Sequence, residues 1–270
     1  MTSARATSSV NWSETTVSAC GGQVRVAVAG SGPPILVLPR DQGHPPTSPF
    51  LDDLAASGTV YYPWLAGFHG GNPAQWEWLT NVRDLAVVNR QVIDTLGLEK
   101  PALVGLGFGG WVAAEIATMA ASNLAALVLV SAMGIKPVHG FIFDQFLVST
   151  EHYAQTAFHD GDKFAEIYGA ETGFEQLEAW ETDREMTSRL AWKPYMYNPA
   201  LPQLLAGVTA PALVVWGDDD KIVPRECAEL YRDALPNATL EVLPNCGHAV
   251  DLEQPGALLR TVSSFLARVS

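Results

Sequence analysis

Short, largely apolar runs recur along this chain, and they limit its fold more than any other feature of the sequence. Such a run, bounded by turn-forming residues, is typical of a strand buried on both faces of a parallel sheet. The runs are Ile35–Leu38, Thr59–Tyr62, Ala102–Leu106, Leu127–Val130, Ala212–Trp216 and Thr239–Leu243. Segments with helical spacing alternate with them, at Trp78–Leu96, Trp111–Ala121, Arg225–Leu235 and Pro255–Val269. The alternation predicts an α/β fold, in which helices cover both faces of a mostly parallel central sheet.

The N-terminal part of the chain precedes this alternation. Residues 1–12 are small and polar, which predicts a loose tail. Thr15–Cys20 and Gln23–Ala29 have the residue types of strands, and Gly21-Gly22 between them is a hairpin signal. We therefore expect a β-hairpin before the first buried strand.

A central stretch, residues 131–211, contains no convincing buried strand over about eighty positions, which is too long for a loop. It carries three segments with helical character, Phe141–Ser149, Lys163–Tyr168 and Phe174–Leu190. We interpret residues 134–205 as a helical cap inserted into a core domain formed by residues 13–133 and 206–270. The many aromatic residues of the cap are expected to fill its own core, to line a pocket beneath it, or both.

Composition and charge exclude several classes of function. The chain has 270 residues, of which 48% are hydrophobic and 17% charged, enough for one α/β domain with an insertion. Its formal net charge of −13 opposes binding to nucleic acid and to anionic lipid, so we expect neither partner. The N-terminus lacks the apolar core of a signal peptide, and no apolar run reaches the roughly 20 residues of a membrane helix.

The number and spacing of the three cysteines indicate the redox environment of the protein. Cys20, Cys227 and Cys246 are far apart and odd in number, so they form neither a disulfide framework nor a CxxC metal site. We expect a protein of the reducing cytoplasm with no metal and no cofactor. The oligomeric state stays open.

Residues 102–113 carry the most specific motif, and they read Ala-Leu-Val-Gly-Leu-Gly-Phe-Gly-Gly-Trp-Val-Ala. An apolar run enters, a short glycine-rich turn follows, and an alanine-rich helix leaves. This is the layout of a nucleophile elbow, G-x-S-x-G, in which a serine is held at a sharp turn. The frame here is Gly105-Leu106-Gly107-Phe108-Gly109, so Gly107 stands where the nucleophile belongs. We predict a sharp turn at Gly107 between a strand ending near Leu106 and a helix beginning near Phe108.

Two later segments complete the pattern. Residues 214–224 read Val-Val-Trp-Gly-Asp-Asp-Asp-Lys-Ile-Val-Pro, and residues 245–255 read Asn-Cys-Gly-His-Ala-Val-Asp-Leu-Glu-Gln-Pro. Together with the elbow frame, they resemble the α/β-hydrolase superfamily over residues 15–270. The resemblance implies an α/β-hydrolase fold with a cap inserted after the sixth core strand, an orienting acid at Asp220 and a general base at His248. A carboxylate that holds one ring nitrogen of a histidine leaves the other free to accept a proton.

The chain departs from the family pattern at the nucleophile and at the oxyanion hole. Gly107 has no side chain, so covalent catalysis through it is excluded. Residues 38–43 read Leu-Pro-Arg-Asp-Gln-Gly, where the family usually has His-Gly followed by an oxyanion-hole residue. The backbone N–H groups of Phe108 and Asp41 are the expected oxyanion donors. A carboxylate of Asp41 that points inward would oppose a developing oxyanion.

A third departure concerns the expected pocket wall. Trp64 stands where the family usually has aspartate, and His69 where it usually has a small residue. The expected lining residues are Arg40, His44, Trp64, His69, Phe143 and Trp192. A metal site formed by Asp41, His44 and His69 is an open alternative, although these residues show no standard ligand spacing.

These features favour an enzyme that is not a conventional serine esterase. Gly107 is expected to leave a space the size of a hydroxymethyl group, in which a water or a substrate group lies within reach of His248. The leading hypothesis is non-covalent acid–base catalysis by a His248–Asp220 dyad, either as a hydrolase or as a lyase or isomerase, on a small hydrophobic carbonyl compound. The alternative is a catalytically inactive protein that binds a small molecule or acts as a scaffold, because glycine relieves the strain of an elbow.

Overall fold

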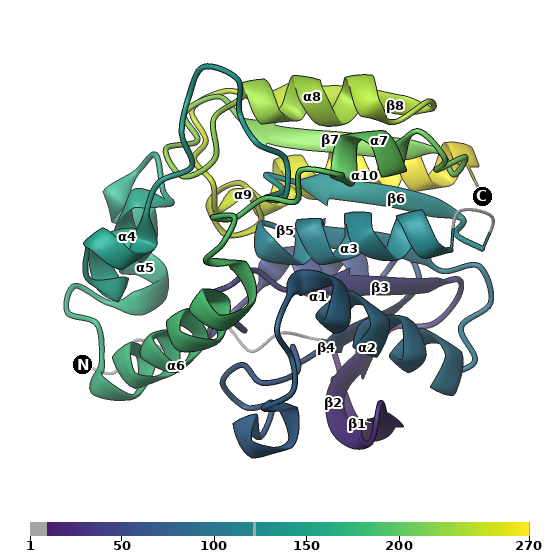
Figure 1. The fold of residues 1–270 in the computed structure, drawn as a ribbon, viewed down its shortest axis with the longest axis horizontal. Coiled ribbons are helices and arrows are strands. Elements are labelled where there is room, and N and C mark those ends of the chain that lie inside the picture. The colour runs from purple at the N-terminus through teal and green to yellow at the C-terminus, as the bar shows by residue number, and fades with distance from the viewer. Residues whose placement is uncertain (1–9, 121–122, 270) are drawn as a thin grey trace.

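A computed structural model describes residues 10–120 and 123–269. The expected tail at residues 1–12 therefore lies outside the described residues up to residue 9. An eight-stranded sheet with the order β1-β2-β4-β3-β5-β6-β7-β8 forms the centre (Figure 1). The strands are β1 (Ser13–Ala19), β2 (Gly22–Ala29), β3 (Pro34–Leu38), β4 (Thr59–Pro63), β5 (Ala102–Leu106), β6 (Ala126–Val130), β7 (Ala212–Gly217) and β8 (Ala238–Leu243). β1 and β2 form the expected hairpin, β2 also pairs antiparallel with β4, and all other neighbours are parallel.

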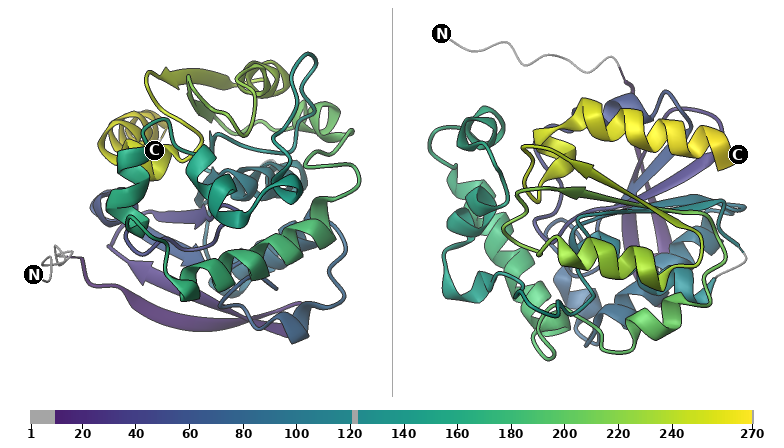
Figure 2. Two further views of the ribbon diagram at one scale, coloured as in Figure 1. Left: turned by 90° about the vertical axis from the view of Figure 1, so that its left-hand side faces the viewer. Right: turned by 90° about the horizontal axis from the view of Figure 1, so that it is seen from above.

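Helices cover both faces of the sheet, as the alternation of the sequence predicts (Figure 2). One face carries α2 (Val82–Thr95), α3 (Phe108–Met119), α7 (Leu201–Leu205) and α8 (Glu226–Ala234). The other face carries α1 (Pro49–Leu54), α9 (Val250–Glu253) and α10 (Pro255–Val269). The β5 and β6 residues are buried throughout, because these central strands pack against helices on both sides. The fold is thus an α/β-hydrolase fold.

A group of helices from the middle of the chain lies beside one end of the sheet, at the left in Figure 1. These are α4 (Thr150–Thr156), α5 (Gly161–Tyr168) and α6 (Phe174–Ala191), with single 3₁₀ turns η1 (Pro73–Trp76) and η2 (Gln145–Leu147) elsewhere in the loops. Below, "cap helices" means α4, α5 and α6. Within residues 10–120 and 123–269, no helix combines the length and the apolar character needed to cross a membrane.

The structure differs from the expected helices at two places. Residues 141–149 form no α-helix, because Phe143 N–H donates to the carbonyl of Ile222 (2.8 Å) and Asp144 caps only the short turn η2. The helix expected over Trp78–Leu96 begins only at Val82, since the Asn81 side chain accepts from the Asp84 N–H (2.9 Å) and so caps the helix there. A backbone contact with Ile222 decided the first case and the capping side chain of Asn81 the second, whereas the apolar spacing ran across both places.

Candidate active site

The turn between β5 and α3 contains Gly107, with φ 52° and ψ −115°. Its N–H donates to the Val130 carbonyl (2.9 Å), and its own carbonyl accepts from Gly110 N–H (3.0 Å) and Met133 N–H (3.1 Å). The turn is therefore fixed between β6 and α3 by its backbone alone. The N–H of Phe108 is the first of α3, so it has no acceptor within its own helix and is available to a ligand.

A histidine and an aspartate from two different loops meet above this turn. Asp220 follows β7 and His248 follows β8, and His248 Nδ1 lies 2.9 Å from Asp220 Oδ2. The other Asp220 oxygen accepts from the N–H groups of Ile222 and Val223 (2.9 Å each), so the carboxylate is held in place. Both side chains are buried, with 2% and 0% of their surface exposed. Because a carboxylate only accepts, Nδ1 carries the proton and Nε2 is left as the basic nitrogen.

The Nε2 atom of His248 lies directly against Gly107. A Cβ atom added to Gly107 would lie 3.0 Å from His248 Nε2 and 3.3 Å from the Cβ of Arg40. Nε2 is buried and has no hydrogen-bond partner among the described residues. The space expected above Gly107 is therefore narrower than a hydroxymethyl group, because the imidazole ring occupies part of it. An unpartnered basic nitrogen beside a bare backbone turn can accept a proton from a bound molecule.

Arg40 and Asp41, which follow β3, form the third side of the site. The Arg40 guanidinium makes an ion pair with Asp251 from α9, and both side chains are 5% exposed. Asp41 Oδ2 accepts from the Tyr153 hydroxyl (2.9 Å) and from Gln145 Nε2 (3.3 Å). Tyr153 belongs to α4 and Gln145 to η2, so this carboxyl group connects the core to the segment that contains the cap helices.

Burial raises the pKa of Asp41. Desolvation raises the pKa of its carboxyl group above the usual value, and the opposing effects of His248, the Tyr153 hydroxyl, its own N–H and Arg40 are smaller. The neutral carboxylic acid is thereby favoured, and a neutral acid can donate a hydrogen bond as well as accept one. The sequence suggested that an inward carboxylate would oppose an oxyanion, and a protonated Asp41 would not.

A second buried carboxyl group, Asp183 on α6, lies near the first. Its Oδ1 accepts from the His69 N–H (2.7 Å), and a Cβ added to Gly43 would lie 2.9 Å from its Oδ2. Burial raises the pKa of Asp183 to about 7, with a smaller contribution in the same direction from Asp41. Sequence reasoning missed Asp183, because nothing in its helical surroundings distinguishes it from a solvated aspartate.

Replacing Asp183 by asparagine is expected to change how stability depends on pH. A carboxyl group with a pKa of about 7 in the folded state and an ordinary pKa of 3.8 in the unfolded chain keeps its proton on folding. Its stabilising effect is therefore complete below pH 4 and is lost as the pH rises through 7. The Asp183→Asn variant should therefore gain at least about 1 kcal/mol in free energy of unfolding, relative to wild type, between pH 4 and pH 8. Urea unfolding at both pH values measures this difference. The exposed Asp233→Asn variant is the control, and an equal change there would contradict the prediction.

Two of the expected lining residues pack on each other at the end of β4. The His44 ring stacks on Trp64 and lies tilted against Tyr62, with ring centroids 4.0 Å apart in both pairs. Its Nε2 lies 3.2 Å from the Pro63 carbonyl, and burial lowers the pKa of His44 to about 4, so the ring is neutral near pH 7. The Arg25 guanidinium lies over the ring of Trp64, 4.2 Å from the ring centroid. These packing contacts explain the positions of the His44 and Trp64 side chains without a role in catalysis for either of them.

The other expected lining residues are distributed differently. Phe143 stacks on Tyr153 (6.3 Å between centroids), so it lies next to the hydroxyl that binds Asp41. His69 is exposed and touches this region through its backbone N–H. Trp192 is 55% exposed and lines a separate cavity. The structure therefore brings Arg40, Asp41 and Gly107 together with the His248–Asp220 pair, and it does not bring the side chains of His69 and Trp192 there. No group of three His, Cys, Asp or Glu residues suited to a metal occurs among the described residues.

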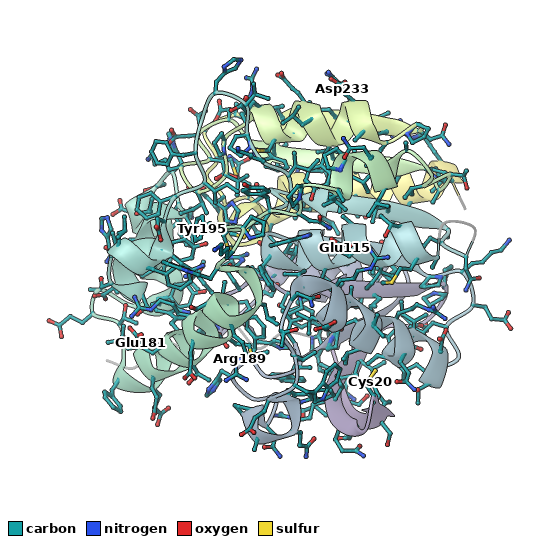
Figure 3. All side chains as sticks on the ribbon, viewed as in Figure 1. Cys20, Glu115, Glu181, Arg189, Tyr195 and Asp233 are labelled. Carbon is teal, nitrogen blue, oxygen red and sulfur yellow. The ribbon has the colours of Figure 1, made fainter. Side chains whose placement is uncertain are left out.

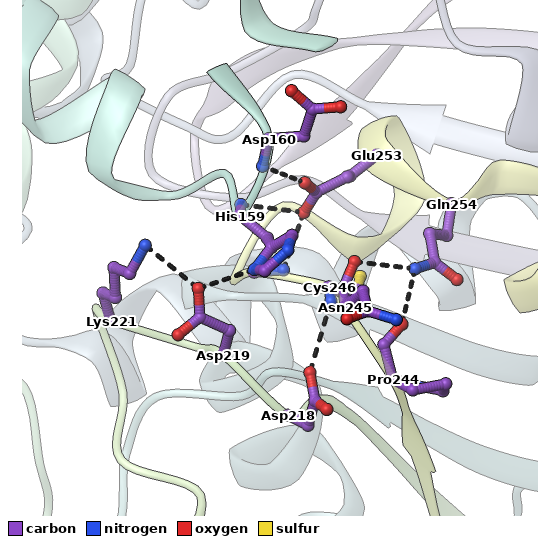
Figure 4. Close-up of polar contacts among 11 residues, drawn as sticks. His159, Asp160, Asp218, Asp219, Lys221, Pro244, Asn245, Cys246, Glu253 and Gln254 are labelled. Carbon is purple, nitrogen blue, oxygen red and sulfur yellow. Dashed lines mark hydrogen bonds and ion pairs between the residues drawn. The ribbon is translucent and has the colours of Figure 1, made fainter. Parts of the chain in front are cut away.

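A glutamate connects the segment around His248, residues 245–255, which we call the histidine loop, to the chain that leads from α4 to α5 (Figure 4). Glu253 accepts from the N–H groups of Gly247 (2.6 Å), His159 (3.1 Å) and Asp160 (2.7 Å). The Ala249 N–H donates to the carbonyl of Ala157 (2.8 Å), two residues from His159. The position of His248 therefore depends on contacts with the chain between the cap helices α4 and α5. Sequence spacing places Glu253 in the histidine loop but gives no sign of this function.

Comparisons with known proteins agree with this architecture. A family model described as the alpha/beta hydrolase family matches residues 20–261. A protein of Variovorax paradoxus that carries the name of a carbamate hydrolase, RutD, is 28% identical over 212 residues, which are 74% of this chain and 79% of the relative. A 2-hydroxy-6-oxononadienedioate/2-hydroxy-6-oxononatrienedioate hydrolase of Paraburkholderia phymatum is 28% identical over 205 residues, 68% of each chain.

Solved structures show the same fold. The 2-hydroxy-6-oxo-6-phenylhexa-2,4-dienoate hydrolase from Rhodococcus sp. strain RHA1 superimposes with a TM-score of 0.74 at 20% identity, over 96% of this chain and 100% of that one. At this level of identity the likeness concerns the fold alone. The relatives that these comparisons name are hydrolases, and each name describes that relative.

Proposed function

The chain belongs to the alpha/beta hydrolase family, and from that premise we propose an enzyme that works without a serine nucleophile. Gly107 stands at the turn where a family nucleophile would be expected, so no acyl-enzyme can form there. The proposed chemistry is non-covalent acid–base catalysis, with His248 as the base and Asp220 as the residue that orients it. The observation that carries the proposal is the buried, unpartnered Nε2 of His248, which lies against the bare turn at Gly107.

The base would take a proton from a water or from the substrate itself. Its Nε2 is buried, and its protonated form would be stabilised by the Asp220 carboxylate 2.9 Å from Nδ1. A positioned base contributes about 10²–10⁴ to a rate, which is enough for an easy hydrolysis, a retro-aldol cleavage or a proton-transfer isomerisation. This geometry supports hydrolase chemistry and lyase or isomerase chemistry alike.

We propose Asp41 as the acidic partner of this base. Its carboxyl group is buried and raised in pKa, and it is oriented by Tyr153 and Gln145. In its neutral form it would donate a hydrogen bond to a substrate oxygen on which negative charge develops. The Phe108 N–H would be a second donor, at the start of α3. A base on one side and a neutral acid on the other favour the transfer of a proton across a carbonyl compound.

The proposed substrate is a small hydrophobic carbonyl compound. Phe143 and Tyr153 supply aromatic surface beside Asp41, and relatives are named as hydrolases of 2-hydroxy-6-oxo-dienedioates or of carbamates. Such substrates combine a reactive carbonyl group with a conjugated or polar chain.

The second candidate function, a catalytically silent ligand-binding protein, is favoured by the absence of a side chain at residue 107.

The Gly107→Ser variant tests whether His248 can act as a base at the elbow. Adding a hydroxyl beside Nε2 should raise the hydrolysis of 4-nitrophenyl acetate at least about tenfold, because a base-activated serine opens an acyl-enzyme route. The gain should stay far below that of a competent esterase, since a weak oxyanion hole typically lowers kcat by about 10²–10³. The positive φ of 52° and the approach to 3.0 Å should also lower the free energy of unfolding by about 1–3 kcal/mol.

Gly107→Ala is the matched control, because it adds the same Cβ and the same strain without the hydroxyl. Both variants are assayed next to wild type, with thermal unfolding measured in parallel. A gain in Gly107→Ser that is absent in Gly107→Ala supports a basic His248. Equal esterase rates in the two folded variants would mean that His248 is not a base at this position, and would favour the ligand-binding alternative.

A further inference from the structure

A cavity lies between the core and the end of α6, the longest of the cap helices. It has a volume of about 540 Å³, and its walls come from the start of α2, the middle of α3 and the chain from the end of α6 to Pro199. We call it the α3–α6 cavity. Figure 3 shows two of its residues, Glu115 on α3 and Arg189 near the end of α6. Its size falls within the range of small-molecule sites. Neither Gly107 nor the His248–Asp220 pair lies on its walls.

The acidic residue of this cavity, Glu115, already has hydrogen-bond donors that compensate its negative charge. The Glu115 side chain is 1% exposed and accepts from Arg83 Nη1 (2.9 Å), Asn198 Nδ2 (2.6 Å) and Trp111 Nε1 (3.2 Å). A buried carboxylate with three donors has little capacity left to attract a cation. The charges of Arg83 and Glu115 therefore cancel each other, and this pair adds no net charge to the cavity wall.

Two further cations on the rim have no such partner. Arg189 has only a distant ion pair with Glu185, at 3.9 Å, whose side chain is 79% exposed. Lys193 makes no ion pair among the residues that the structure describes. In a chain with a net charge of −13, two weakly compensated cations on the rim of one cavity form a local positive site.

Aromatic surface lies beside these cations. Trp111 contributes a nearly buried indole to the wall, while Trp192 is 55% exposed, an unusual degree for so large an apolar side chain. Trp192 is held in position by edge contacts with Phe146 (5.1 Å) and Tyr195 (6.4 Å). Three other cavities, of 440 to 650 Å³, carry no tryptophan or tyrosine on their walls. The α3–α6 cavity thus combines a flat apolar surface with positive charge.

We propose that the α3–α6 cavity binds a small organic anion, namely an aromatic or similarly flat carboxylate. The apolar body of the ligand lies against Trp111 and Trp192, and its carboxylate pairs with Arg189 and Lys193. Charge-assisted hydrogen bonds to a carboxylate are the stronger kind, and planar guanidinium groups suit them in geometry. This site is separate from the proposed acid–base site and does not depend on it.

Binding of 4-fluorobenzoate, followed by ¹⁹F NMR line broadening, tests the proposal, with the neutral 4-fluorobenzamide as the matched probe. Wild type should bind the benzoate saturably and at least about tenfold more tightly than the benzamide, because only the benzoate carries the charge. The Arg189→Ala/Lys193→Ala double variant should weaken benzoate binding at least about tenfold and leave the benzamide nearly unaffected. Lys193→Glu, an exposed single change, should act in the same direction, and Trp192→Ala should weaken both probes.

A double variant with the same loss of charge elsewhere is the control. Lys163→Ala/Arg232→Ala removes two exposed cations from α5 and α8, outside the cavity, and should change benzoate binding by less than about twofold at physiological salt. Three results would overturn the proposal: no saturable binding up to about 10 mM, equal affinity for the two probes, or unchanged benzoate affinity in the Arg189→Ala/Lys193→Ala and Lys193→Glu variants. Unchanged affinity would place the bound benzoate at another site of the protein.

Discussion

Replacing His248 by alanine is expected to lower kcat/KM about 10²–10⁴-fold, because the variant loses the only proposed base beside Gly107. The loss should appear on every compound that wild type turns over, in a panel of activated lactones and 2-hydroxy-6-oxo-dienoates. Ligand affinity should change far less than turnover, since Nε2 acts on a proton and contributes little to binding in the ground state. Circular dichroism and urea unfolding verify that the variant is folded.

Asp220→Asn should reduce turnover in the same range for a different reason. The asparagine oxygen can still accept from the N–H groups of Ile222 and Val223, so the loop stays in place. Its amide group then donates to His248 Nδ1, which moves the ring proton to Nε2 and removes the base. The two variants therefore test one mechanism through different atoms.

The protein supplies its own control for this experiment. His159 and Asp219 form a similar pair, with Nδ1 2.8 Å from Oδ2, but both side chains are 39% exposed (Figure 4). His159→Ala and Asp219→Asn should leave turnover within about twofold of wild type, because surface pairs contribute little. Turnover that survives in His248→Ala, or falls equally in His159→Ala, contradicts the acid–base proposal. If no form of the protein turns over any compound while all bind ligand equally, the ligand-binding alternative holds.

The second large effect concerns stability and the ion pair below the site. Asp251→Ala should lower the free energy of unfolding by about 3–5 kcal/mol, because it leaves the Arg40 guanidinium buried without its partner. Desolvation acts to lower the pKa of Arg40, and the charge of Asp251 is the largest effect that offsets it. Without that carboxylate, the buried arginine still carries the energetic cost of desolvation but loses the attraction that offsets it. Urea unfolding near pH 7 measures the loss.

Two further variants separate this explanation from loss of packing. Arg40→Met/Asp251→Leu removes both charges and should recover most of the stability, since apolar pairs replace buried ion pairs at little cost. Glu14→Ala breaks the exposed pair with Arg25, whose side chain is 44% exposed, and should cost less than about 1 kcal/mol. If Asp251→Ala also costs less than about 1 kcal/mol, Arg40 has another partner in solution.

Much of the fold could be read from local patterns, and the physical reason lies in the sheet. Strands buried on both faces must be apolar throughout, so β3, β5, β6 and β7 are visible as runs in the sequence. Helix boundaries were less visible, because single capping side chains such as Asn81 decide them. The short helix α1 was missed, since six residues do not establish a helical period.

The candidate site divides along the same line. Gly107 could be named from its strand–turn–helix motif, whereas Asp220 and His248 were named from the resemblance of residues 214–224 and 245–255 to the α/β-hydrolase superfamily. All three follow strands, and parallel strands end at the same edge of a sheet. Asp183, Tyr153 and Asp251 could not be identified as part of the site. They lie on helices whose residue pattern says which side is apolar, but not which polar group will be enclosed.

Residue types at fixed places along the chain predict the architecture and the turn without a nucleophile, and the resemblance of two later segments to the α/β-hydrolase superfamily predicts the histidine–aspartate pair. Three properties are visible only in the folded chain: the imidazole of His248 lies against Gly107, burial raises the pKa values of Asp41 and Asp183, and Trp192 lines a cavity outside the candidate active site. These properties depend on how closely the cap helices approach the core. That approach is set by contacts between residues far apart in the chain, such as His69 with Asp183, which are 114 positions apart, and no local pattern records them.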